Sequence, residues 1–161
     1  MDAIDRRKFL KMTGLGAGAL TLGGLVWRIG GVWWDQPAAT HYKILSEREV
    51  EIFDAIAEAM FPGEGGDIDP IPSGVEAGVT DFFDRFFADV LHEGPRNALR
   101  VLVHAIDEMA IGADLGLTRF HKRPLEERVE ILQAWENSSL APRRAAFSAI
   151  KLFASMGYCE N

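Results

Sequence analysis

The chain has 161 residues, of which 48% are hydrophobic, and its formal net charge is −7. This length supports one modest domain with a real core. The acidic balance argues against nucleic-acid binding, because phosphate recognition requires a basic face. The single cysteine, Cys159, cannot form a disulfide within the chain, so cysteine usage gives no information about the redox compartment.

Residues 1–34 differ in composition from the rest of the chain. Two adjacent arginines precede a Phe-Leu-Lys sequence, and a glycine-rich, mildly apolar stretch follows from Met12 to Trp27. This arrangement resembles a twin-arginine translocation signal, with Asp5 in place of the usual Ser or Thr. The predicted export-signal residues are Arg6, Arg7, Phe9, Leu10 and Lys11.

Two other interpretations of this stretch are weaker. A dinucleotide-binding loop would use Gly14 to Gly18, but such a loop follows a strand, and charged residues precede it here. A basic surface helix of a cytoplasmic protein would not carry the segment from Ala17 to Trp27, which is almost free of polar groups. The export signal is the favoured interpretation.

Removal of the signal after export stays an open question. No Ala-x-Ala sequence follows the apolar stretch, and the 23 residues from Met12 to Trp34 could span a bilayer although Arg28 interrupts them. Three tryptophans at the far end suit either a membrane interface or a partner protein: Trp27, Trp33 and Trp34. We therefore predict a twin-arginine signal or N-terminal membrane anchor over 1–34, a linker over 35–44 and a domain over 45–161.

The chain beyond residue 34 is strongly acidic. Residues 35–161 carry 12 basic and 22 acidic side chains, a net charge of about −10. Such a surface stays soluble and repels an anionic bilayer. We expect any membrane association to come from the N-terminal segment or from a partner.

The first predicted helix begins at a capping box, Ser46-Glu47-Arg48-Glu49. Apolar residues follow at helical spacing: Val50, Phe53, Ala57 and Met60. Pro62 ends this helix, and a loop rich in glycine, proline and aspartate runs from Pro62 to Pro72.

A second helix is predicted to begin at Ser73, and it carries a broad apolar stripe with four phenylalanines. Packing in the core is the first explanation of this stripe. Four phenylalanines are more than a small bundle readily buries, however, so part of the stripe is predicted to dock a partner. The predicted interface residues are Val75, Val79, Phe82, Phe83, Phe86 and Phe87.

Three further helices are expected. The third follows Gly94-Pro95, the fourth has Pro124 in its first turn, and the fifth begins at Pro142. No alternating apolar stretch or Asn-Gly hairpin turn indicates a strand. The sequence predicts an all-α fold, a small bundle of about five helices.

Metal-ligating patterns are few. His104 and Glu108 lie four residues apart with Asp107 beside them, so they could share a metal, but no second pair supplies the other ligands. An exposed polar face is the favoured interpretation. Glu64, Asp67 and Asp69 resemble a calcium loop without its twelve-residue spacing and its closing glutamate, so a turn with solvated carboxylates is favoured there.

Catalytic patterns are also missing from the sequence. No serine stands in a Gly-x-Ser-x-Gly turn, and Cys159 lies close to the chain end, where an active-site wall is hard to build. No Cys-x-x-Cys-His sequence is present to attach haem covalently. We predict no catalytic, cofactor-binding or metal-binding residue in this chain.

Four sequence segments together resemble the gluconate 2-dehydrogenase subunit 3 family. The first holds the capping box and the helix that ends at Phe61-Pro62, and the second is the small-residue stretch from Pro72 to Val79. The third runs from Phe120 to Leu132, and the fourth ends at Met156-Gly157-Tyr158. Their order along one chain is more specific than any one of them.

The resemblance implies the small, non-catalytic subunit of a membrane-associated oxidoreductase. Family members accompany a large FAD-dependent dehydrogenase of the glucose-methanol-choline (GMC) type, often with a multihaem cytochrome c subunit. The small subunit carries the twin-arginine signal, so the twin-arginine translocase would export the folded flavoprotein with its escort to the periplasm.

Two rival classes remain at this point. One is a stand-alone exported protein that binds a ligand or a metal, and the other is an independent exported enzyme. The first requires a cavity with convergent polar groups, and the second requires a catalytic constellation that the sequence does not offer.

Overall fold

The structure is a computed structural model that describes residues 36–65, 70–110 and 118–160. Clustering of contacts separates the chain at Gln36, and the second unit is Pro37–Asn161. All the described helices belong to the second unit. The predicted export signal and the possible membrane anchor lie outside the described residues, so they stay predictions.

Five α-helices and one short 3₁₀ helix account for most of the described chain, and no strand is found in these ranges, which confirms the predicted all-α fold. The elements are α2 (Glu47–Met60), α3 (Val79–Asp89), α4 (Glu93–Met109), η2 (Phe120–Lys122), α5 (Leu125–Glu136) and α6 (Ala141–Glu160).

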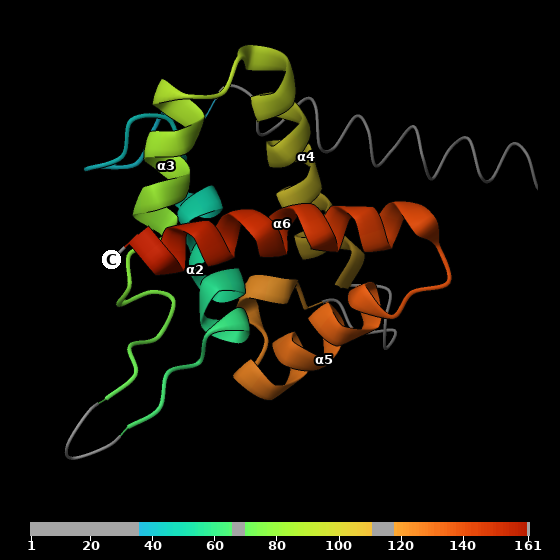
Figure 1. The fold of residues 1–161 in the computed structure, drawn as a ribbon. Helices are drawn as coiled ribbons and strands as arrows, with labels where there is room; N and C mark the ends of the chain where they lie inside the picture. The colour runs from blue at the N-terminus through green and yellow to red at the C-terminus, as the bar shows by residue number, and fades with distance from the viewer. Residues whose placement is uncertain (1–35, 66–69, 111–117, 161) are drawn as a thin grey trace, which may run out of the picture. The chain divides into compact units, whose positions relative to one another are not determined.

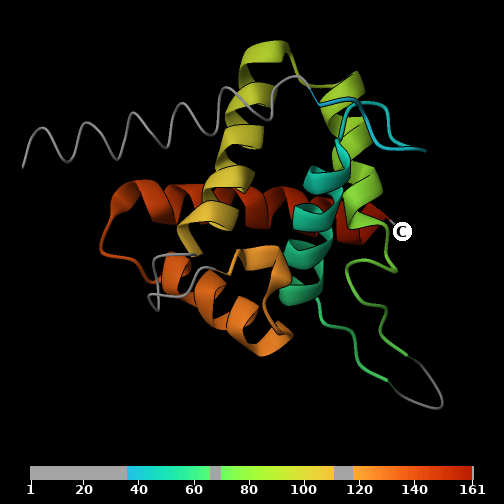
Figure 2. The ribbon, with the colours of Figure 1, turned by 180° about the vertical axis from the view of Figure 1, so that it is seen from behind.

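Helix α2 is the centre of the bundle. It packs against α3, α4, α5 and η2, whereas α6 packs against α3, α5 and α4. Figure 1 shows α6 lying across the other helices, and the view from behind shows α2 and α4 on the opposite side from α6 (Figure 2). The bundle therefore has a central helix, α2, which contacts most of the other elements, and an outer one, α6.

The core is built mainly from aliphatic and phenylalanine side chains. Phe53 of α2 lies at its middle and contacts Phe83 and Phe87 of α3, with ring centroids 4.4 Å and 5.7 Å away. Other fully buried apolar side chains surround this cluster: Leu45, Ile52, Ile56, Val79, Val103, Ile106, Phe120 and Ile150.

The start and the end of α2 confirm the sequence prediction. Ser46 and Glu49 form a capping box, in which the Ser46 backbone N–H donates to Glu49 Oε2 over 2.9 Å. The helix ends at Met60, two residues before Pro62. The starts of α4 beside Gly94-Pro95, of α5 after Pro124 and of α6 beside Pro142 also agree with the prediction.

The predicted start of the second helix at Ser73 is wrong. Ser73 does exchange hydrogen bonds with Glu76 in the manner of a capping box, but these bonds close only a short turn. The backbone then takes a left-handed conformation at Gly78, with φ of 70°, and α3 begins at Val79. A left-handed residue interrupts a right-handed helix, and glycine adopts it at little cost.

No helix in the described part of the chain combines the length and the apolar character needed to cross a bilayer.

Candidate functional site: a buried charge network and the surfaces around it

Glu49 is the centre of a charged contact between α2 and α4. Glu49 is only 1% exposed. Arg100 of α4 donates to both carboxylate oxygens, from Nε over 2.6 Å and from Nη2 over 2.9 Å. His104 Nε2, one turn further along α4, lies 3.2 Å from Glu49 Oε1. The capping carboxylate of α2 is thus also the anchor for α4.

The surroundings lower the pKa values of both Glu49 and His104. Burial alone raises the pKa of Glu49, but hydrogen bonds from His104, Arg100 and Ser46 outweigh it and hold that pKa at about 2. Burial lowers the pKa of His104 in spite of the hydrogen bond to Glu49. Near neutral pH the network therefore holds an ionised Glu49 beside a neutral His104.

A second set of charges lies one turn further along α4. Arg48 Nη2 of α2 donates to Asp107 and to Glu108, over 2.8 Å in each case. Asp107 is fully buried, and its Oδ1 also lies 2.7 Å from Nδ1 of His121 in η2. Arg119 Nε lies 3.3 Å from Glu108. These contacts join α2, α4 and η2.

Two further arginines bind backbone carbonyls of α4 and α2. Arg123 Nη2 donates to the Ala110 carbonyl, just beyond the end of α4, over 2.9 Å. Arg128 Nη1 donates to the Ala55 carbonyl over 3.2 Å, and its Nη2 donates to Glu58 over 2.7 Å. Both side chains are buried. Arg123 satisfies a carbonyl at the end of α4 that has no partner within the helix, whereas Arg128 joins α5 to α2.

The prediction that His104, Asp107 and Glu108 form an exposed polar face is wrong. Their exposed fractions are 2%, 0% and 7%. The helical spacing placed them on one face correctly, but that face packs against Arg48 and Glu49 of α2. Within the described ranges no group of three or more His, Cys, Asp or Glu residues could hold a metal ion.

The segment that resembles a calcium loop is only partly described. Glu64 pairs through its backbone with Ile71, whereas Asp67 and Asp69 lie outside the described residues, so the turn with solvated carboxylates stays a prediction.

The structure divides the predicted docking stripe. Val79, Phe83 and Phe87 are no more than 1% exposed, so the prediction that they contact a partner is wrong, because this chain's own core covers them. Phe82 and Phe86 are half-buried and Val75 is 43% exposed. For these three residues the partner interface stays a prediction.

Asp84 is a structural residue that the sequence prediction missed. It lies among the four phenylalanines, yet it is buried and accepts three backbone hydrogen bonds, from Lys43, Ile44 and Leu45, over 2.7, 3.0 and 3.1 Å. A lone carboxylate inside an apolar stripe was the only available signal. Asp84 fixes the chain as it enters α2.

Three distant segments meet at the C-terminal end of α2. The Tyr158 ring of α6 stacks on Phe61, with centroids 4.3 Å apart, and its hydroxyl donates to the Pro72 carbonyl over 2.8 Å. The Gly74 N–H donates to the Phe61 carbonyl over 2.7 Å. A Cβ on Gly74 would lie 2.4 Å from the Ala57 carbonyl oxygen, so only glycine fits this approach.

A shallow groove of about 330 Å³ lies beside this junction, between α2, α5 and α6. Its lining includes Met60, Val129 and Phe147, and the ion pair of Lys151 with Glu136, 2.8 Å long, lies at its edge. The groove is mostly apolar and holds no convergent set of catalytic groups.

The fold and the site together define a small helical protein whose buried charges brace its helices against one another. Residues 47–160 match the family model described as gluconate 2-dehydrogenase subunit 3, and the chain belongs to this family. No curated protein and no solved structure matches the chain.

The family match confirms the resemblance seen in the sequence, and it shows a subunit of a dehydrogenase in general terms. In the structure, three of the four segments that carry the resemblance lie next to one another. The helix that ends at Phe61-Pro62, the stretch that contains Gly74 and the closing Gly157-Tyr158 contact one another at the junction.

Proposed function

We propose that this chain is a non-catalytic small subunit that escorts a folded FAD-dependent dehydrogenase through twin-arginine export and stabilises it in the complex. The expected partner is a large GMC-type enzyme that acts on a sugar or an alcohol, and a cytochrome c subunit often joins this pair in the family. The family match over residues 47–160 carries this proposal, and the arginine pair Arg6-Arg7 supports the export role.

The contacts of the buried carboxylates support a structural role for this chain. The buried carboxylates Glu49, Asp107 and Glu108 are each engaged by an arginine of the same chain. A general acid or base needs access to a substrate proton. These carboxylates instead neutralise the partly buried guanidinium groups of Arg48 and Arg100, and pairing of this kind is what makes buried charge tolerable.

The proposed location of the protein is the periplasm. It would associate with the membrane through its partner or through an uncleaved N-terminal segment. The twin-arginine route carries folded proteins, so the flavoprotein would acquire FAD in the cytoplasm before transport. The acidic surface of residues 35–161 would not hold the domain on an anionic bilayer by itself.

Purification of the full chain through a C-terminal tag tests the subunit role. We expect a larger protein to copurify, with the flavin absorbance of bound FAD. A preparation from native membranes that contains this chain alone, without flavin, would contradict the proposal.

Paired replacement of the two arginines tests the escort role. Changing Arg6→Lys and Arg7→Lys keeps the charge but removes the planar guanidinium groups. We expect both this chain and its flavoprotein to remain in the cytoplasm, as measured by fractionation and flavin content. The matched control is Arg28→Lys, outside the motif. Continued export of the flavoprotein in the paired variant would contradict the escort mechanism while leaving the subunit role intact.

A further inference from the structure

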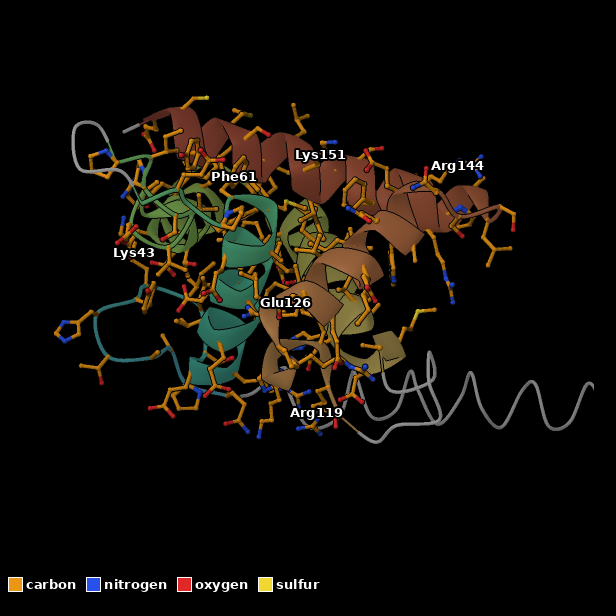
Figure 3. The ribbon with its side chains drawn as sticks, turned by 90° about the horizontal axis from the view of Figure 1, so that it is seen from below. Lys43, Phe61, Arg119, Glu126, Arg144 and Lys151 are labelled. Atoms are coloured by element: carbon orange, nitrogen blue, oxygen red, sulfur yellow. The ribbon has the colours of Figure 1, made fainter. Side chains whose placement is uncertain are left out.

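We draw no further inference here: the strongest candidate, the apolar outward face of α6 with Leu152 and Met156 59% and 47% exposed, on the helix that carries Lys151 in Figure 3, carries nothing because nothing in the described part of the chain shows what covers it.

Discussion

The two sides of α2 are held in opposite ways. Toward α4, the contact is built from charges, with Glu49 bound to Arg100 and to His104. Toward α3, the contact is built mainly from aromatic rings, with Phe53 packed on Phe83, beside one hydrogen bond from Thr80 to Asp54. A charged contact in a core is stabilising only while every member is present, and it responds to pH. An aromatic contact loses stability in proportion to the area removed, and pH does not affect it.

The largest effect is expected on the charged side, from Glu49→Ala. The change leaves the cation of Arg100 buried without its carboxylate, so we expect a loss of about 3–5 kcal/mol in the free energy of unfolding. Urea unfolding followed by circular dichroism measures it. In the double-mutant cycle with Arg100→Ala, the second change should cost much less than it does alone. Additive losses would show that the two residues do not act as a unit.

On the aromatic side, Phe83→Ala should cost about 3–5 kcal/mol, because Phe83 is fully buried between helices. Phe82→Ala is the matched control on the neighbouring residue, which is half-buried and packs on Gly157 of α6. We expect a loss of about 1–2 kcal/mol there, in line with its smaller buried area. If Phe82→Ala also releases a copurifying protein, its predicted role in docking is supported. Equal losses of stability would contradict the division of the stripe.

The two sides of α2 should differ most clearly in how their contribution to stability depends on pH. The pKa of Glu49 falls from 4.5 to about 2 on folding, so its stabilisation is complete above pH 4.5 and is lost as the pH falls toward 2. At about 1.4 kcal/mol per pKa unit, the loss is roughly 3 kcal/mol. His104 also has a pKa lowered from 6.5, so the unfolded chain takes up a proton more readily and the decline begins below pH 6.5.

The measurement for this prediction is the free energy of unfolding between about pH 7 and pH 3. We expect the early part of the decline, near about pH 6, to be smaller in His104→Gln. The Phe83→Ala variant should show the same pH dependence as the unsubstituted chain at a lower stability. A stability that stays constant across this range would contradict the assigned role of the network.

Sequence periodicity predicted the aromatic side of α2 well and the charged side poorly, for a physical reason. Apolar residues at helical spacing form one face that packs inward, so the sequence alone places Phe53 in the core. The Ser46 and Glu49 capping box was also predictable because it is local. That Glu49 binds Arg100 and His104 depends on which face of α4 meets α2, and a charged face looks the same in sequence whether water or another helix covers it.

Two other differences between the sequence prediction and the structure also arise from tertiary contacts. The expected helix start at Ser73 failed because the later turn at Gly78 depends on a left-handed backbone, which the glycine permits but does not require. The docking stripe divided because α3 presents Phe83 and Phe87 to the core while Phe82 and Phe86 lie toward α6. Spacing within one helix does not reveal which neighbour covers each residue.

The smallest effect is expected at the junction beyond the end of α2, where an aromatic and a polar contact share one side chain. Tyr158→Phe keeps the stack on Phe61 and removes only the hydrogen bond to the Pro72 carbonyl. Because this bond is exposed, its loss should cost about 0.5–1 kcal/mol. Tyr158→Leu removes the stack as well and should cost about 0.5–1.5 kcal/mol more. Urea unfolding of the two variants side by side separates the terms. If Phe and Leu cost the same, the stack contributes nothing, and the hydrogen bond alone ties α6 to the loop before α3.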